Sequence, residues 1–226
     1  MVTSFALLAR RIGSTEAEFR SHWRDVHAPL VAHVDYLRGY VQHRAARASP
    51  DPDLPLSWLD GIAEFWWDDR AAALRPHSDP RYTESAQPDE PRFLDVTRLV
   101  SVQTVPVCIS ESAPAVHGSG ASALMLLVRS TTTGADDFAA VCQQAWRRAV
   151  DSARGTLGKC IVHLVEHDRA GDPPPVDAIV ACRWRDAAAQ QAWQESVVLN
   201  DGRDQARSRV FMTDEHVVLA PPRSCS

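Results

Sequence analysis

The 226-residue sequence has no long hydrophobic run and contains a single lysine. Its apolar runs, such as 123–128, are far shorter than the roughly 20 residues that a membrane-spanning helix needs, so we expect no membrane span. The remaining basic residues are scattered arginines and the net charge is −5, which disfavours a nucleic-acid partner. The N-terminal apolar stretch lacks a basic leader, which predicts no signal peptide.

The sequence also lacks the short motifs of several large enzyme classes. The absence of a Walker A motif, a Rossmann glycine pattern and a G-x-S-x-G elbow disfavours nucleotide-dependent and serine-hydrolase chemistry. The five cysteines show no C-x-x-C spacing and lie mostly in apolar segments, so we interpret them as free thiols of a cytoplasmic protein. His163 and His167 match the H-x-x-E-H zinc motif, but the predicted strand separates such residues by about 13 Å. We therefore predict neither a metal site nor a cofactor.

An internal repeat divides the chain into two halves. Ser, Ala, Gly and Pro dominate the stretch between the halves, which is typical of a surface linker. We predict a first unit at 1–108, a linker at 109–121 and a second unit at 122–226. The corresponding positions, at offsets of 117 to 120 residues, are Phe19 and Phe138, 41–43 and 161–163, and 60–69 and 177–186.

The sequence pattern of the first unit predicts the element order β-α-β-β-α-β. Strands are expected at 2–9, 39–47, 59–67 and 97–105, and a broken helical region at 69–95. The first helix is expected to begin after Thr15, which can form a capping box with Glu18. Its apolar stripe recurs at spacings of three and four: Phe19, Trp23, Val26, Leu30 and Val34.

This order is that of a ferredoxin-like unit, in which an antiparallel sheet carries both helices on one face. The other face of each sheet needs a partner. We therefore predict an α+β fold in which the sheets of two tandem ferredoxin-like units pack into an intrachain barrel. This pseudo-dimer leaves further homodimerisation open.

Four blocks of the first unit match a known family in the expected order. These are 18–30 (EFRSHWRDVHAPL), 37–43 (LRGYVQH), 60–66 (DGIAEFW) and 92–95 (RFLD). On these blocks, which span about 105 residues, the unit resembles the EthD-like branch of the dimeric α/β barrel superfamily. The second unit looks like a degenerate copy, with Trp146 at the position of His27 and Cys160 at that of Tyr40.

The resemblance implies several activities without choosing among them. The wider superfamily includes cofactor-free monooxygenases, haem-handling proteins, muconolactone-type isomerases, and cyclases or dehydratases of aromatic polyketide intermediates. The isomerases are similar in placing a histidine and a tyrosine at positions that correspond to His27 and Tyr40.

Three residues are candidates for catalysis. His27 lies at the edge of the predicted helical stripe, and its pKa near neutrality suits proton transfer; the alternative is a helix-end cap before Pro29. Tyr40 can donate to a substrate oxygen, or it is a core aromatic with its hydroxyl at the rim. Glu64 lies in an otherwise apolar strand and needs a role or a salt bridge, for which Arg24 and Arg44 are the candidates.

Four further residues are assigned to substrate binding: Trp23, Gln42, His43 and Trp66. Strand alternation places Tyr40 and His43 on opposite faces, but leaves open which of them points toward the helices. Because the second half retains a histidine at 163, a structural role is favoured for His43. Asp60 recurs as Asp177, which favours a turn role for both.

The leading hypothesis is a cofactor-free acid–base enzyme, a dehydratase, cyclase or isomerase, in which His27 moves a proton on a hydrophobic aromatic or polyketide-like molecule. Tyr40, with Glu64 behind it, would stabilise the enolate oxygen. One alternative is cofactor-independent oxygenation of a quinol-like aromatic compound. The other is a binding protein that delivers a reactive small molecule to a partner enzyme.

Overall fold

The computed structural model describes residues 1–45, 56–111, 121–152, 157–166, 174–184, 186–196, 204 and 207–222. They form an α+β fold with a mostly antiparallel sheet, which confirms the predicted class. Within this part of the chain, no helix has the length and apolarity needed to cross a membrane.

Contacts divide the described residues into two units. Unit 1 contains 1–45, 57–103 and 215–222, and unit 2 contains the others. This division differs from the predicted ranges 1–108 and 122–226, because β4 (Val100–Glu111) and β8 (Arg209–Leu219) each continue from one unit into the other. β4 also extends into the predicted linker at 109–121, and β5 begins at its last residue.

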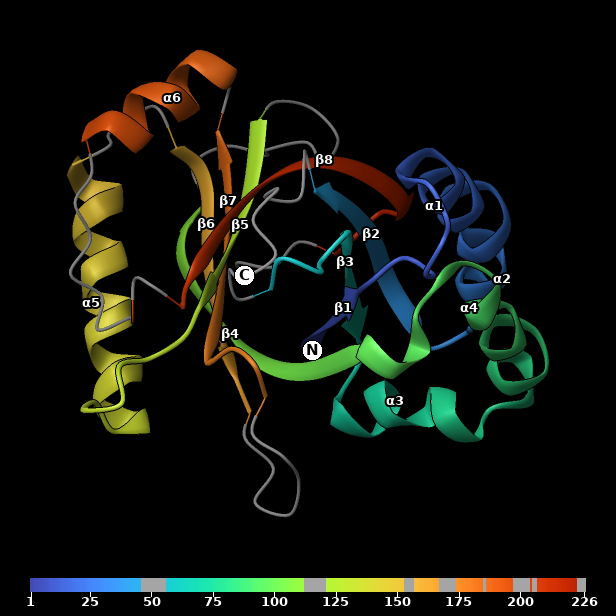
Figure 1. Cartoon of the computed structure of the whole chain (residues 1–226). Coiled ribbons are helices and arrows are strands. Elements are labelled where there is room, and N and C mark those ends of the chain that lie inside the picture. The colour runs from blue at the N-terminus through green and yellow to red at the C-terminus, as the bar shows by residue number, and fades with distance from the viewer. Residues whose placement is uncertain are drawn as a thin grey trace. The chain divides into compact units, whose positions relative to one another are not determined.

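In unit 1, helices lie on one side of three strands in the order β1-β3-β2 (Figure 1). The register pairs Tyr40 with Phe65 and Val41 with Glu64. Phe65 therefore shares a sheet face with Tyr40, whereas Glu64 points the other way. The elements are β1 (Val2–Leu8), α1 (Glu16–His22), α2 (Ala28–Ala32), β2 (Leu37–Ala45), β3 (Gly61–Trp67), α3 (Arg70–Leu74) and α4 (Gln87–Phe93).

The predicted first helix begins as expected but is not regular. Thr15 caps α1 and forms the capping box with Glu18. Between α1 and α2, Trp23–His27 forms a π-helical turn, in which the Ala28 N–H donates to the Trp23 carbonyl five residues earlier. Pro29 follows directly, and because it has no N–H and its ring crowds the carbonyl four residues back, an α-helical turn is disfavoured there.

The same pattern recurs in the second helical region of unit 1. Tyr82–Ala86 forms a π-helical turn, closed by the Gln87 N–H on the Tyr82 carbonyl, and Pro88 follows. Each turn adds one residue to its helix and so shifts the face that later residues present. Val26, predicted to face the sheet, is 44% exposed, whereas His27 and Val31 are buried; the predicted Val34 lies in the core and Leu30 packs against it.

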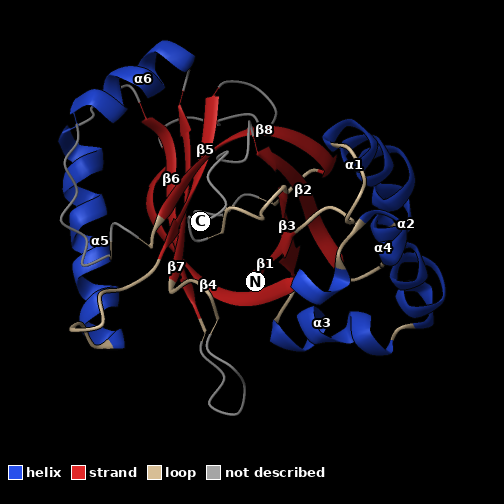
Figure 2. Cartoon of the chain, in the orientation of Figure 1, coloured by secondary structure: helices blue, strands red, loops and turns tan. Residues whose placement is uncertain are grey.

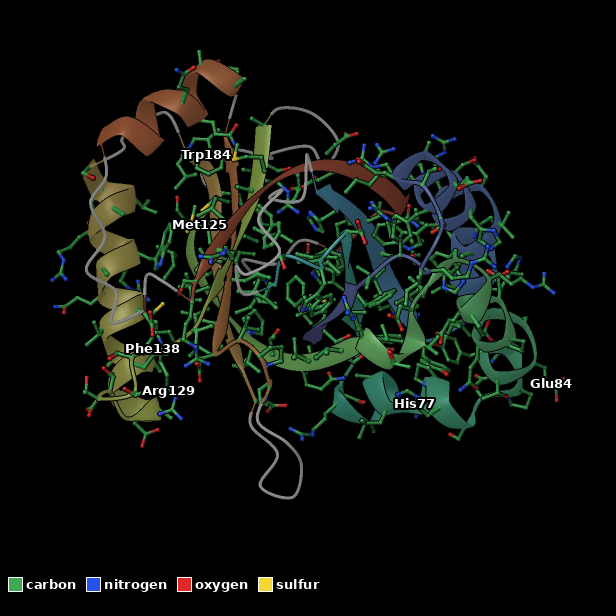
Figure 3. The ribbon with its side chains drawn as sticks, in the orientation of Figure 1. His77, Glu84, Met125, Arg129, Phe138 and Trp184 are labelled. Carbon is green, nitrogen blue, oxygen red and sulfur yellow. The ribbon has the colours of Figure 1, made fainter. Side chains whose placement is uncertain are left out.

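Unit 2 orders its strands β8-β5-β7-β6-β4, with α5 and α6 beside them (Figure 2). Phe138 on α5 packs into one apolar core with Met125 and Trp184 of the strands (Figure 3). α5 is unbroken, and Trp146, at the position that corresponds to His27, is fully buried in that core. The remaining elements are β5 (Ala121–Leu127), α5 (Ala135–Ser152), β6 (Leu157–Val165), β7 (Ala178–Trp184) and α6 (Ala187–Ser196).

The repeated aspartates have the predicted structural role. Asp60 accepts from the Arg10 backbone N–H at 2.8 Å and from the Arg10 guanidinium at 2.9 Å. Asp177 does the same for Arg129, at 2.8 and 2.9 Å. Each aspartate therefore binds the second residue after the first strand of its half and lies directly before the start of a neighbouring strand.

The cysteines differ in part from the expectation. Cys142, Cys160 and Cys182 are buried free thiols, but Cys108 is disulfide-bonded, so the argument for a reducing compartment loses its support. Of the H-x-x-E-H motif, His163 lies in β6 as predicted and 167 is outside the described residues. The described residues contain no group of three side chains suited to hold a metal ion.

Candidate active site

An apolar cavity of about 100 Å³ lies in unit 1, between the sheet and the helices. Tyr40, Phe65 and Trp23 form part of its wall, so the helix-covered face of the sheet carries the cavity. The exposed residues His77 and Ser101 also line it and mark its mouth. The side chains with transferable protons in the wall are His27, Tyr40, His77, Tyr82 and Glu90.

His27 is buried in this wall and is held by Asp89. Its Nδ1 lies 3.1 Å from the Asp89 carboxylate, and the Phe93 ring packs 4.8 Å from the imidazole. Asp89 and Phe93 are four residues apart on α4, so both reach the same side of that helix. Because a carboxylate can only accept, Nδ1 carries the hydrogen and Nε2 is left as a free base.

The same carboxylate binds a second imidazole. Nε2 of His22 lies 3.0 and 3.1 Å from the two Asp89 oxygens, and Arg92 lies 3.8 Å away. An α-helix would place His22 and His27 about 140° apart, since each residue advances by about 100°. The π-helical turn between them lets one carboxylate reach both.

Burial dominates the electrostatics of His27. It lowers the pKa of His27 below its ordinary value, and the hydrogen bond and charge of Asp89 offset part of this effect. The imidazole is therefore neutral near pH 7, the form that can accept a proton.

Tyr40 has a hydroxyl that is prepared to donate. Its oxygen accepts from the Trp23 indole N–H at 2.9 Å and from the Gln42 amide at 3.1 Å. The Gln42 nitrogen also lies 2.9 Å from the Trp23 carbonyl, which fixes the orientation of the amide. Both lone pairs of the hydroxyl are thus used, so its hydrogen is left to donate toward the cavity. Burial raises the pKa of Tyr40, which keeps the phenol protonated.

Glu90 and Tyr82 form a second polar pair in the cavity wall. The Tyr82 hydroxyl donates to Oε1 of Glu90, across a helical stretch that includes the second π-helical turn. Burial raises the pKa of Glu90, and the hydrogen bond from Tyr82 offsets part of this shift. The shift is toward the protonated form, and Glu90 lines the same cavity as His27.

Three of the predicted site residues lie on the other face of the sheet. His43 Nε2 is 2.8 Å from Glu64 Oε2, and His43 Nδ1 is 3.8 Å from Glu215. Trp66 follows the same alternation as Glu64. Glu64 therefore does not stand behind Tyr40, and it pairs with His43.

The structure thus brings together His27, Tyr40, Trp23 and Gln42, and it separates Glu64, His43 and Trp66 from them. Sequence reasoning missed Asp89 and Glu90. Asp89 was detectable as an acidic residue four positions before Phe93, within the helical region that faces the first helix.

Comparison with known proteins supports the family. A family model described as the EthD domain matches residues 11–97. A conidial pigment biosynthesis dehydratase, EthD, of Metarhizium robertsii is 33% identical over 100 residues, which covers 39% of this chain and 70% of the relative. The chain belongs to the EthD family. The four resembling blocks lie within or beside the matched region, and His27, Tyr40 and Asp89 all fall inside it.

Two solved structures resemble this EthD-family chain in fold. An anthrone oxidase-like protein has a TM-score of 0.61 at 9% identity, covering 96% of this chain and 93% of its own. A putative monooxygenase of Fusobacterium nucleatum subsp. nucleatum has a TM-score of 0.63 at 7% identity, with the same coverage. At such identities the likeness concerns the fold alone.

Proposed function

We propose that this EthD-family protein is a cofactor-free acid–base enzyme that acts on a hydrophobic aromatic or polyketide-like molecule. The observation that carries the proposal is the neutral, buried imidazole of His27, fixed by Asp89 in the wall of an apolar cavity. Dehydration is favoured over cyclisation and isomerisation because the 33% identical relative is named a dehydratase.

The chemistry begins at the carbon next to a carbonyl group. His27 Nε2 removes a proton from that carbon, and the resulting positive charge is stabilised by Asp89 on the other ring nitrogen. The Tyr40 hydroxyl donates to the carbonyl oxygen as the enolate forms, which stabilises the developing negative charge.

The size of the cavity restricts the substrate. A cavity of about 150 Å³ holds a benzene ring, and drug-sized ligands occupy about 300–1,000 Å³. Because the cavity of this structure measures about 100 Å³, the reacting ring must displace part of the wall or project through the mouth at His77 and Ser101. A substrate with two or three rings would therefore bind with its reacting ring inward.

The test uses two ketones in heavy water. The wild type is expected to exchange deuterium into C2 of 1-tetralone and to convert 3-hydroxy-1-tetralone into 1-naphthol, and His27→Gln is expected to lose both reactions by about 10²–10⁴-fold. His33→Gln, which changes an exposed histidine at the end of α2, is the matched control and should behave as wild type. Mass spectrometry measures both reactions.

Other outcomes of this test favour the alternatives. Oxygen consumption with anthrone by the wild type, without deuterium exchange, would favour the monooxygenase. Retention of either ketone without any reaction would favour the binding protein and would leave His27 as a helix-end residue.

We further propose that the two halves are tandem ferredoxin-like copies that pair as an intrachain barrel. The strand orders and the matched registers, His43 with Ile62 and His163 with Ile179, support this. Co-expressed fragments 1–108 and 122–226 should then purify as a one-to-one complex. Independent elution of the fragments would contradict the pairing.

A further inference from the structure

We infer that Glu90 is the general acid of the site, and that the site therefore eliminates water from a β-hydroxy ketone. This inference rests on the proposed function, since it assigns the second proton of a reaction that His27 begins. An elimination needs a base for the C–H bond and an acid for the departing oxygen, because hydroxide leaves poorly without protonation.

The cavity wall supplies one suitable donor for that second proton. Tyr40 keeps its proton because burial raises its pKa, and its hydrogen faces the enolate oxygen in the proposed mechanism. Tyr82 uses its hydrogen on Glu90, and His77 lies exposed at the mouth. Among the residues that line the cavity, Glu90 is the remaining acid.

The geometry of Glu90 fits this role. Tyr82 donates to Oε1, and among the described residues Oε2 has no hydrogen-bond or ion-pair partner. Oε2 is therefore the atom from which the protonated form of Glu90 would donate to a ligand in the cavity. Its immediate neighbour on α4, Asp89, holds His27, so the acid and the support of the base come from consecutive residues of one helix.

The elimination balances as follows. His27 Nε2 takes the proton from the carbon next to the ketone, and the electrons of that C–H bond form the new C=C bond. The C–O bond to the hydroxyl breaks, and its electron pair goes to oxygen, which takes the proton from Glu90 and leaves as water. The imidazolium and the Glu90 carboxylate return to their starting forms by exchanging one proton through water at the mouth.

The experiment compares three tetralones that separate the two proton transfers. 1-Tetralone has no leaving group, so deuterium exchange at C2 reports the His27 step alone. 3-Hydroxy-1-tetralone and 3-acetoxy-1-tetralone both yield 1-naphthol, but acetate leaves without protonation. Absorbance of 1-naphthol measures the two eliminations.

Glu90→Gln is expected to slow the loss of water by about 10²–10³-fold and the loss of acetate by less than about fivefold. Exchange at C2 of 1-tetralone should stay within about twofold of the wild type, since the base is intact. Glu84→Gln is the matched control, because Glu84 lies exposed on the outside of the same helical region (Figure 3). Near-wild-type loss of acetate also shows that Glu90→Gln is folded.

Three results overturn the inference in distinguishable ways. If Glu90→Gln eliminates water at the wild-type rate, Glu90 is not the general acid. If Glu90→Gln slows loss of water, loss of acetate and C2 exchange by the same factor, Glu90 instead supports substrate binding or the position of His27. Inactivity of the wild type toward all three ketones contradicts the proposed function itself, and the inference with it.

Discussion

Replacing Asp89 with asparagine tests the central feature of the site, a carboxylate that fixes the tautomer of a buried histidine. Asp89 accepts from His27 Nδ1 at 3.1 Å and is almost fully buried, so no solvent can substitute for it. An asparagine can turn its amide nitrogen toward the ring, which favours hydrogen on Nε2 and removes the free base. The corresponding change in a Ser-His-Asp triad lowers the rate by about 10⁴-fold.

We expect a loss of about 10²–10⁴-fold in C2 exchange for Asp89→Asn, which corresponds to about 3–5 kcal/mol of barrier. The variant should also lose about 1–3 kcal/mol of unfolding free energy, because hydrogen bonds to a charged acceptor become neutral ones. Asp25→Asn, which changes an exposed aspartate in the same helical stretch, is the control and should retain wild-type rates.

The direct measurement is ¹⁵N NMR of the His27 ring, which identifies the protonated nitrogen without any substrate. In wild type we expect the Nδ1–H form near pH 7, and in Asp89→Asn the Nε2–H form. The pKa of His27 should fall further in the variant, because the stabilising charge is gone, so the acidic limb of the pH–rate profile moves to lower pH. An unchanged tautomer together with an unchanged rate would refute this account of the site.

The stability of the fold should also depend on His27. Its pKa is lowered in the folded state, so below about pH 6.5 the unfolded chain binds more protons and stability falls with falling pH, an effect that His27→Gln should remove from denaturant titrations. Tyr40→Phe should slow exchange by about 10²-fold and destabilise by about 1–3 kcal/mol, because the Trp23 indole N–H loses its acceptor; normal thermal stability would contradict the network. Gly61→Ala should cost about 1–3 kcal/mol, since the new Cβ would lie 2.6 Å from the Trp23 ring. Pro29→Ala should allow an α-helical turn, raising helix stability while lowering activity; equal activity would show that the π-helical turn does not position His27.

The sequence was sufficient to predict the helices and strands of the first unit, because local signals and packing favour the same structure there. The capping box at Thr15 and the alternating strands have purely local causes, and the structure contains them. Four of the five residues predicted for the apolar stripe face the core, and Val26 is the exception. Regular spacing assumes one helical period, and the π-helical turn breaks it; the nearby Pro29 is the signal that such a break was favoured.

The candidate site was predictable where residues lie on one element and not where distant elements meet. His27 and Tyr40 emerged from position on a helix and a strand. Asp89 lies 62 residues from His27, and its partner depends on how two helical regions pack. The prediction that Glu64 lies behind Tyr40 was wrong. Strand alternation assigns residues to two faces of the sheet without showing which face the helices cover, and a buried carboxylate is compatible with either face.

The two π-helical turns have a consequence for how the family can change over time. Each is a one-residue insertion followed by a proline that keeps the helix from relaxing to the regular form. Loss of that single residue would remove the π-helical turn and shift the phase of the helix by about 100°, which would carry His27 away from Asp89. The unbroken α5 of unit 2, with a buried Trp146 at the corresponding position, is what such a helix looks like. Among relatives, a length difference of one residue before the proline should therefore distinguish scaffolds that catalyse from those that only fold.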